Sequence, residues 1–357
     1  MDDYISVQTA AKKWKVTPRW VNDYCNNGRI PGAKRWEGKK DWLIPKNTKK
    51  PVDARTKTAK AKSSEAKPFL KWAGGKGQLL TEIGKYYPFA EKKHIKKYAE
   101  PFVGGGAVLF DVLNKHAVDE VYISDINAEL INTYITIRDN SDELISRLKT
   151  MESDYLAKDA DARKKAYLEA RARFNALKRD GIRDAEAATL MIFLNRTCFN
   201  GLYRVNKAGD YNVPMGAYKN PQICNEDNLL NVSKKLQNAN IVCGDYKDSA
   251  SFIDDKTFVY FDPPYRPLTK TANFTSYTEQ LFDDNKQLEL ANFVQDLDNK
   301  GALIVISNSD PKNTDENDNF FDDAYSKQNI RRVAANRMIN RNSDARGKIN
   351  ELLITNF

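Results

Sequence analysis

The strongest constraint on the fold is a series of short apolar segments that alternate with helical patterns from Pro68 to the end of the sequence. Several of these segments, each read as a strand, lead into an acidic or glycine-rich turn: KYAE before PFVGGG, VYIS before DIN, IVC before GDY and FVYF before DPPY, with ALIVISNS as a further buried strand. Strands that alternate with helices form mostly parallel sheets, which bind ligands at the carboxyl ends of their strands. We therefore expect an open α/β sheet whose glycines and acids meet at one edge.

A glycine-rich turn follows the first of these strands. Gly104-x-Gly106 matches the dinucleotide-binding fingerprint in part, although Leu109 stands where that fingerprint has Gly or Ala. Asp125 lies 19 residues beyond Gly106, close to the spacing at which an acid meets a ribose hydroxyl. The pattern favours an adenosine-containing ligand, with a purely structural glycine turn as the alternative. The GGKG run at 74–77 lacks the glycine spacing and the hydroxyl residue of a Walker loop, which excludes nucleoside triphosphate hydrolysis.

The sharpest motif is Asp262-Pro263-Pro264-Tyr265, which follows an apolar strand. The two prolines fix the backbone and remove two N–H donors, so an Asp carboxylate, the Pro263 carbonyl and an aromatic ring remain at the strand end. The two oxygen groups can accept both hydrogens of a planar amine, and the ring can stack on the heterocycle that carries it. Positioning alone can then direct the nitrogen lone pair at an electrophilic methyl carbon. An ordinary strand-end turn is the alternative for the tetrapeptide taken by itself.

Histidine and cysteine are too scarce for several common kinds of site. The chain has two histidines and four cysteines, and no two cysteines form a CxxC pair. These counts exclude a histidine-rich metal centre and argue against a zinc site or a disulfide framework. We expect no metal and a reducing, cytoplasmic location. We also expect no membrane attachment, because the N-terminus lacks a signal-peptide core and no apolar run approaches the length of a bilayer span.

The net charge of +9 is concentrated near the N-terminus. Residues 1–68 hold 17 Lys and Arg against 7 Asp and Glu, whereas the other 289 residues hold 40 against 41. Such a basic segment attracts polyanions such as DNA. Its lysine-rich part, residues 47–67, is interpreted as a flexible basic linker, with a merely solubilising tail as the alternative.

Residues 1–46 have the pattern of a small folded domain. A short amphipathic helix that buries Trp14 is followed by Thr17-Pro18, a typical helix start, and by a second helix that stops at Gly28. Two tryptophan-bearing segments around Glu37-Gly38 then predict a two-stranded wing. The pattern resembles the small winged helix-turn-helix domains of the excisionase and MerR type, which implies DNA binding. A protein-binding module of similar shape is the alternative.

The motifs of the larger part resemble those of Dam-type DNA adenine-N6 methyltransferases, and they stand in the order found in that family. They are FLKWAGGK (69–76), EPFVGGGAV (100–108), SDIN (124–127), LNRTCFNGLYRVNKAGDYNVPMGAY (194–218), YFDPPY (260–265), PLTKTANFTSY (267–277) and the final KINELLITNF. The resemblance covers residues 68–357 and implies a Rossmann-like class I methyltransferase sheet with an inserted, mainly helical target-recognition domain at 131–235. It also implies methyl transfer from S-adenosyl-L-methionine to adenine in double-stranded DNA, commonly within GATC. Because duplex adenine is stacked, the base must be flipped out.

The same resemblance implies roles for individual residues. The cofactor would be held by Trp72, Lys76, Gly104, Gly105, Gly106, Asp125 and Asp262, with Asp245 near its adenine. The target base would meet Asp262, Pro263, Pro264 and Tyr265. The DNA would be contacted by Lys71, Arg196, Phe199, Asn200, Leu202, Arg204, Pro214 and Tyr218. Among these, Arg204 would read a guanine, Lys71 would contact the outer guanine of the site, and Phe199 would act as a wedge in the stack. Local core is the alternative for Leu202, Val213 and Tyr218.

Two other functions stay open for the sequence. The first is methylation of cytosine N4, RNA or protein glutamine, since related tetrapeptides serve those amines. The second is a catalytically silent DNA-binding regulator. The N-terminal domain, which simple members of the family lack, is expected either to add phosphate affinity or to bind an operator. A cognate restriction endonuclease that acts on the same site is the partner expected in a restriction–modification system.

Overall fold

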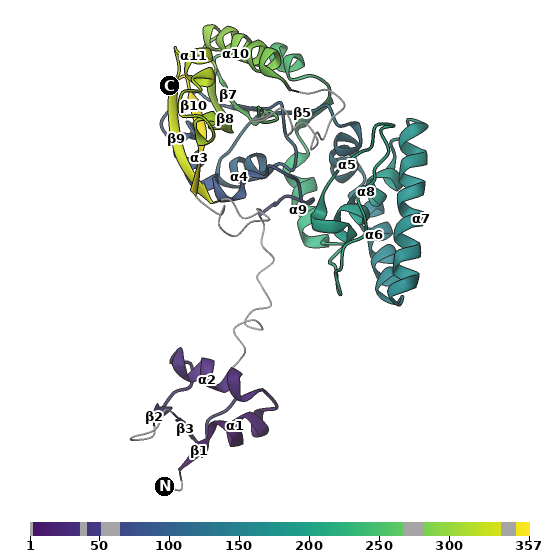
Figure 1. Ribbon diagram of the computed structural model, residues 1–357, viewed down its shortest axis with the longest axis vertical. Helices are drawn as coiled ribbons and strands as arrows, with labels where there is room; N and C mark the ends of the chain where they lie inside the picture. The colour runs from purple at the N-terminus through teal and green to yellow at the C-terminus, as the bar shows by residue number, and fades with distance from the viewer. Residues whose placement is uncertain (1–2, 36–40, 51–64, 267–281, 337–347) are drawn as a thin grey trace. The chain divides into compact units, whose positions relative to one another are not determined.

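The computed structural model describes residues 3–35, 41–50, 65–266, 282–336 and 348–357. The chain divides into two compact units, Met1–Ser63 and Ser64–Phe357 (Figure 1). The predicted wing turn at Glu37-Gly38, most of the predicted linker and the motif at 267–277 lie outside the described residues. The domain limits expected from the sequence, including those of the recognition insert, stay predictions.

The N-terminal unit contains two helices and a small antiparallel sheet. Its elements are β1 (Tyr4–Ser6), α1 (Val7–Trp14), α2 (Pro18–Asn26), β2 (Lys34–Arg35) and β3 (Trp42–Pro45), with the strand order β1-β3-β2. Side-chain oxygens cap both helix starts: Ser6 accepts from the Thr9 amide at 3.1 Å, and Thr17 accepts from the Trp20 amide at 3.2 Å. The sequence did not predict β1, which pairs with β3 along its whole length.

This unit has a hydrophobic core of its own, built from Ala10, Ala11, Trp14, Val21, Tyr24, Cys25, Ile30 and Ile44. Between the two helices Lys15 takes a left-handed conformation with φ 54°, so the chain turns within three residues. The helix-turn-helix motif expected for these two helices stays a prediction. The function of the unit as a DNA-binding module stays a prediction.

The larger unit is built on a sheet of seven strands in the order β6-β5-β4-β7-β8-β10-β9. These strands are β4 (Lys97–Glu100), β5 (Glu120–Asp125), β6 (Ala239–Cys243), β7 (Thr257–Phe261), β8 (Leu303–Ser309), β9 (Asn329–Asn336) and β10 (Lys348–Thr355). Strands β6, β5, β4, β7 and β8 are parallel to one another, whereas β10 is antiparallel to both β8 and β9. The predicted α/β sheet is therefore confirmed as mostly parallel, with an antiparallel edge that the sequence did not predict.

The strand order reverses direction at β4. From β4 the chain continues to β5 and β6 on one side, and it returns to β7 and β8 on the other side. In open α/β sheets the ligand crevice lies outside the carboxyl ends of the strands at such a reversal. The turns that follow β4, β5 and β7 are thereby brought next to one another, and these turns carry the predicted site.

Helices flank the sheet and also form a group beside it. They are α3 (Leu80–Ile83), α4 (Ala107–Lys115), α5 (Ala128–Asp139), α6 (Ser141–Leu156), α7 (Ala160–Arg179), α8 (Ala185–Thr197), α9 (Glu226–Leu236), α10 (Asp284–Asn299) and α11 (Phe320–Ala324). Figure 1 shows α6, α7 and α8 in teal, grouped at one side of the sheet. Helix α5 connects the two parts, because it packs on β5 and β6 as well as on α8.

The described residues include neither a membrane-spanning helix nor a metal-binding cluster. No helix in the described ranges is long and apolar enough to cross a membrane. Within the same ranges, no three His, Cys, Asp or Glu side chains gather in a way that could hold a metal ion.

Candidate active site

The glycine turn after β4 and the acid at the end of β5 are bonded directly to each other. The Gly104 amide donates to Asp125 Oδ2 at 3.1 Å, and the Asn127 amide donates to Asp125 Oδ1 at 2.9 Å. The Tyr134 hydroxyl donates to the Gly104 carbonyl at 3.0 Å. Burial raises the pKa of Asp125, and the backbone amide bonds offset part of that rise. The two features that the sequence predicted at one ligand site are therefore in contact.

The glycines of this turn are required by close packing. Gly104 and Gly106 have φ angles of +45° and +70°, which L side chains rarely adopt. A Cβ on Gly105 would lie 2.9 Å from Trp72 Cβ, and one on Gly106 would lie 2.5 Å from the Tyr134 hydroxyl. The Trp72 indole in turn stacks on Tyr203, with 5.5 Å between ring centroids. Glycines therefore allow the turn to pack closely against Trp72 and Asp125 at the sheet edge.

An ion pair that the sequence did not predict lies at the end of β7. Lys76 Nζ is 2.6 Å from Asp262 Oδ1, although Lys76 is only 4% exposed and Asp262 is 21% exposed. The same ammonium donates to the Gly74 carbonyl at 2.9 Å, and the Ser307 hydroxyl donates to Asp262 Oδ1 at 3.1 Å. Burial raises the pKa of Asp262, while the charge of Lys76 and the bonds from Lys76 and Ser307 offset part of the rise. The carboxylate is therefore fixed and paired with a cation.

The rest of the predicted tetrapeptide is also held in place. The Tyr265 hydroxyl donates to Glu351 Oε2 at 2.6 Å, and Gln287 Nε2 donates to the Pro264 carbonyl at 2.9 Å. Lys76 Nζ lies 4.8 Å from the centroid of the Tyr265 ring. Within the described ranges, the Pro263 carbonyl accepts no hydrogen bond. The Pro263 carbonyl, the Asp262 carboxylate and the Tyr265 ring thus lie together at one strand end.

Four polar residues around this site were missed by the sequence analysis. Ser307 and Glu351 hold Asp262 and Tyr265 directly, and Gln287 holds Pro264 and accepts from Asn308 Nδ2 at 3.2 Å. The fourth, Glu100, is only 2% exposed and accepts from the Tyr98 hydroxyl at 2.6 Å.

Burial raises the pKa of Glu100 well above its usual value. Glu100, Ser307 and Glu351 lie in motifs that the sequence did single out. A buried-type strand that carries a carboxylate or a hydroxyl is the signal that points to them.

The predicted recognition segment forms an exposed turn and a small hairpin after α8. The turn Phe199–Gly201 follows the helix, and isolated bridges pair Cys198 with Met215 and Val205 with Tyr211. Phe199 is 52% exposed, and Asn200, Arg204 and Pro214 are exposed as well. Arg204 Nε donates to Asn212 Oδ1 at 2.7 Å and Nη2 donates to the Asn212 carbonyl at 3.4 Å, which fixes one side of the guanidinium while the group stays at the surface. Four predicted DNA contacts are therefore presented to solvent.

The segment is attached to the FLKW motif by hydrogen bonds. Asn195 accepts from the Lys71 amide and donates to the Lys71 carbonyl, both at 2.8 Å, and it also donates to the Gly201 carbonyl at 2.9 Å. Lys71 Nζ donates to the Tyr218 hydroxyl at 3.2 Å and lies 4.5 Å from the centroid of that ring. Lys71 and Tyr218 therefore act as a pair beside the exposed turn.

Three predicted residues have mainly internal contacts. Arg196 is half-buried, donates to the Phe69 carbonyl at 2.6 Å, and has its pKa lowered by burial. Its assignment to DNA contact conflicts with this geometry, because the guanidinium is turned into the protein. Leu202 packs against the main core, and Val213 is 1% exposed. Asp245 follows β6 at the same sheet edge, where it is exposed and accepts from the Lys247 amide at 3.0 Å.

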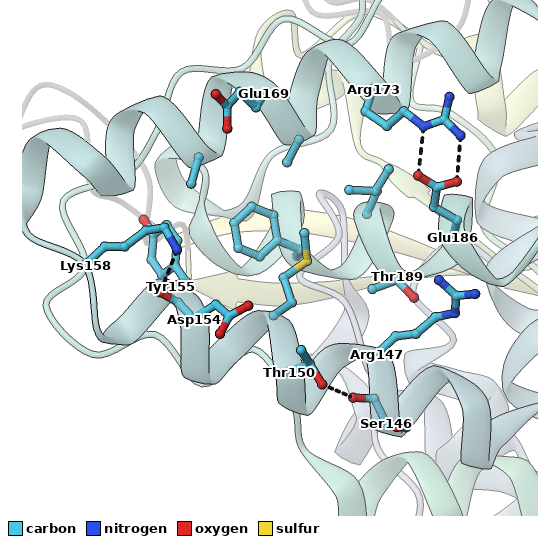
Figure 2. A pocket seen from close by; sticks show the side chains of 15 residues that line it. Ser146, Arg147, Thr150, Asp154, Tyr155, Lys158, Glu169, Arg173, Glu186 and Thr189 are labelled. Carbon is cyan, nitrogen blue, oxygen red and sulfur yellow. Dashed lines mark hydrogen bonds and ion pairs between the residues drawn. The ribbon is translucent and has the colours of Figure 1, made fainter.

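A separate cavity of about 640 Å³ lies among α6, α7 and α8, away from these residues (Figure 2). Its floor is apolar, with Met151 and Phe193 among its lining side chains. Figure 2 shows a bidentate pair at its rim, in which Arg173 donates to Glu186 at 2.8 and 2.7 Å. None of the predicted site residues lines this cavity. The groups suited to amine chemistry lie at the sheet edge.

Comparison with known proteins agrees with this geometry. The family model of D12 class N6 adenine-specific DNA methyltransferases matches residues 72–339. The chain is 48% identical over 295 residues to the Type II methyltransferase M.MjaIII of Methanocaldococcus jannaschii, an alignment that covers 82% of this chain and 100% of that protein.

Two further relatives are more distant. The Type II methyltransferase M1.LlaDCHI of Lactococcus lactis subsp. cremoris is 37% identical, with 82% of this chain and 95% of that protein covered. The DNA adenine methylase of Escherichia coli strain K12 is 35% identical, with 80% and 93% covered. The family match falls entirely within the larger unit.

Proposed function

The chain belongs to the D12 class of N6 adenine-specific DNA methyltransferases, and on that premise we propose which residues hold the reactants and which sequence is methylated. The enzyme methylates adenine N6 in DNA and depends on S-adenosyl-L-methionine. Our proposal is that the target adenine lies within GATC and is flipped out of the duplex into the edge formed by Asp262 and Tyr265.

The observation that carries the proposal is the fixed carboxylate beside a free carbonyl. Asp262 is held by Ser307, and within the described ranges the neighbouring Pro263 carbonyl accepts no bond from the protein. These two acceptors take the two hydrogens of the adenine amine, and the Tyr265 ring stacks on the base. The amine lone pair is then turned out of conjugation with the ring, toward the methyl group. Orientation by fixed groups supplies the catalysis, without a strong base.

The cofactor fits the glycine turn of this chain. Trp72 and Tyr134 leave no room for a side chain at Gly104, Gly105 and Gly106, which keeps the turn compact beside the Asp125 carboxylate, as glycines do in turns that bind dinucleotides. S-adenosyl-L-methionine, when bound, supplies the electrophilic methyl group. We assign the amino-acid part to the glycine turn, Trp72 and Lys76, and the ribose hydroxyls to the buried Asp125 carboxylate. Asp245, at the end of the neighbouring strand, lies at the same edge and is assigned to the cofactor adenine.

Sequence choice is assigned to the exposed turn and hairpin after α8. Arg204 carries the guanine readout, because a guanidinium can pair with O6 and N7 at once and its anchor on Asn212 limits its freedom. Lys71, positioned against Tyr218, contacts the outer guanine. Phe199 is the wedge that replaces the flipped base in the stack, with Asn200 and Pro214 against neighbouring bases. Leu202 supports the turn from the core side, and Arg196 is withdrawn from the set of DNA contacts.

A methyl-transfer assay on paired duplexes tests the site. The protein is incubated with tritiated S-adenosyl-L-methionine and a duplex that contains one GATC, or the same duplex with those four bases scrambled. We expect label in the GATC duplex alone. Equal label in both duplexes would move sequence choice away from Arg204 and Lys71.

The N-terminal unit is proposed to add DNA affinity outside the family fold. Within residues 3–35 and 41–50 it exposes ten cations against three acids, and each cation that meets a phosphate releases counterions. We take Arg19 on α2 and Lys34 on β2 as contacts.

The N-terminal unit could add general DNA affinity or bind a specific operator, and gel shifts separate these two roles. Residues 1–67, which contain a hydrophobic core of their own, are tested on random DNA and on DNA from upstream of the gene. Similar salt-sensitive binding to both supports the affinity role. Binding confined to the upstream DNA supports an operator, and binding to neither overturns both.

A restriction–modification role is proposed from the relatives, two of which are named Type II methyltransferases. Methylation by this chain would then protect host DNA from an endonuclease that cuts the same sequence. Digestion of methylated and unmethylated plasmid with a GATC-cutting endonuclease that is blocked by N6-methyladenine tests the protection. Cleavage of both plasmids would contradict it.

A further inference from the structure

The ammonium of Lys76 lies at the place that the proposed mechanism gives to the adenine amine. It is 2.6 Å from Asp262 Oδ1, 2.9 Å from the Gly74 carbonyl and 4.8 Å from the centroid of the Tyr265 ring. Lys76 is 4% exposed, so the ammonium is enclosed by these groups and is not a mobile surface charge. The Asp262 carboxylate and the Tyr265 ring, which contact this ammonium, are also the two groups that a flipped adenine needs.

We propose that Lys76 occupies the amine site until the cofactor is bound, so that a flipped adenine is accepted only by the cofactor-loaded enzyme. The inference rests on the proposed role of Asp262 and Tyr265. Lys76 then has two states, one bonded to Asp262 and the other bonded to the carboxylate that the methionine part of the cofactor brings. The residue acts as a positioning residue that sets the order of binding.

The adenine amine and the Lys76 ammonium cannot occupy the site beside Asp262 at the same time. The adenine amine and the lysine ammonium are both donors, and a donor placed against a donor gains no hydrogen bond. Asp262 Oδ1 already receives two hydrogens, one from Lys76 and one from Ser307. A base stacked about 3.5–4 Å above the Tyr265 ring would compete for space on this ring with the Lys76 ammonium, which lies 4.8 Å from the ring centroid.

Lys76 is able to move away from Asp262. Its stem is a flexible four-carbon chain with one compact charge at the end. Lys76 begins the short helix Lys76–Gln78, immediately after Gly74 and Gly75, and the same motif brings Trp72 against the glycine turn. A buried ammonium needs an anionic partner, and the cofactor brings a carboxylate to this part of the site. A ligand that binds only one of two states shifts the population toward that state, so cofactor and flipped base bind with positive coupling.

Base flipping without the cofactor is the direct test. 2-Aminopurine is placed next to the target adenine of the GATC duplex, where its fluorescence rises when that adenine leaves the stack, and the full chain is added with or without S-adenosylhomocysteine. For the wild type we expect a rise only with S-adenosylhomocysteine. For Lys76→Met we expect the rise without it, with about tenfold more flipped base than in the wild type under the same conditions, since one charge-assisted hydrogen bond is removed. Equal signals from wild type and Lys76→Met in the absence of cofactor would overturn the proposal.

The chain offers a matched control in Lys97. Its ammonium is also partly buried and also contacts a carboxylate, a carbonyl and a ring: Asp254 at 3.1 Å, the Phe252 carbonyl at 2.6 Å and the Phe252 ring at 4.3 Å. Lys97 lies at the amino end of β4, whereas the site lies at the carboxyl end. Lys97→Met should therefore behave as the wild type does in the flipping assay. If the fluorescence of Lys97→Met also rose without cofactor, the effect of Lys76→Met would reflect a general loss of structure, and the proposal would be overturned.

A measurement on the unaltered chain keeps the proposal testable if Lys76→Met fails to fold. 5′-Methylthioadenosine keeps the adenosine and the sulfur of the cofactor but has no carboxylate to attract Lys76. We expect it to bind without permitting flipping, whereas S-adenosylhomocysteine permits it. Flipping with both ligands would overturn the exchange of partners. Failure of the proposed function is distinguishable, because it removes label from the duplex in the methyl-transfer assay, whereas failure of this inference leaves methylation intact.

Discussion

The hydrogen bond between Tyr265 and Glu351 gives a prediction whose size follows from the structure. The hydroxyl donates to a carboxylate oxygen at 2.6 Å in a partly buried setting, and the ring it orients is the proposed stacking surface for the target base. Hydrogen bonds to charged groups contribute roughly 1.5–3 kcal/mol, which corresponds to roughly 10- to 150-fold in an equilibrium or rate ratio. Replacing Glu351 by Ala should therefore lower kcat/KM for duplex DNA by about tenfold or more. Cofactor affinity should not change.

A double-mutant cycle separates this bond from general damage to β10. Tyr265→Phe removes the hydroxyl and should lose about as much kcat/KM as Glu351→Ala, and the double variant should lose no more than either single change. Glu351→Gln keeps an acceptor oxygen and should recover most of the activity. Single-turnover methylation gives the rates, and thermal unfolding of each variant shows whether the fold is kept. Losses that simply multiply in the double variant would refute the coupling between these two residues.

Further predictions concern the carboxylate, the readout and the glycine turn. Asp262→Ala should abolish methyl transfer in a tritium assay while a gel shift shows DNA binding largely kept. Arg204→Ala should reduce the preference for GATC over single-base variants by a factor that corresponds to roughly 1–3 kcal/mol, measured as a ratio of kcat/KM values, with non-specific binding little changed. Gly106→Ala, which brings a Cβ within 2.5 Å of a hydroxyl, should weaken cofactor binding in calorimetry, whereas Gly77→Ala, with nothing within 4 Å, should not. Burial raises the pKa of Asp262, and the ionised carboxylate is the form that accepts, so kcat/KM should fall as pH drops through a pKa above the usual 3.8. Lys76→Met removes a nearby cation and should move that fall to higher pH. A pH profile in which kcat/KM falls only at or below 3.8 would contradict a raised pKa for Asp262.

The sequence predicted the parts of the site that are local in the chain. A strand followed by Asp262-Pro263-Pro264-Tyr265, and another followed by the turn at 104–106, can be identified from apolar runs and prolines or glycines alone. The parallel sheet followed from the same alternation. Asp125 was placed by its spacing from the turn, and the structure bonds it to the Gly104 amide.

The contacts that complete the site depend on strand order and register, which the local pattern does not contain. Glu351 reaches Tyr265 across 86 residues because β10 inserts antiparallel between β8 and β9 and aligns Glu351 with Ser309. Lys76 was predicted as a cofactor contact, but its pairing with Asp262 follows from the place of β7 beside β4. Arg196 was assigned to DNA by the family resemblance of its segment, and only the packed helix shows its guanidinium on the Phe69 carbonyl.

The most direct test of the account is the identity of the methylated nucleoside made by the wild type and by Asp262→Ala. Each protein is incubated with tritiated S-adenosyl-L-methionine and the GATC duplex, and the DNA is then digested to nucleosides and separated. The account predicts that the wild type yields label in N6-methyldeoxyadenosine alone and that Asp262→Ala, while still binding the duplex, yields none. Label in N4-methyldeoxycytidine, or undiminished labelling by Asp262→Ala, would contradict the assignment of the adenine amine to this carboxylate.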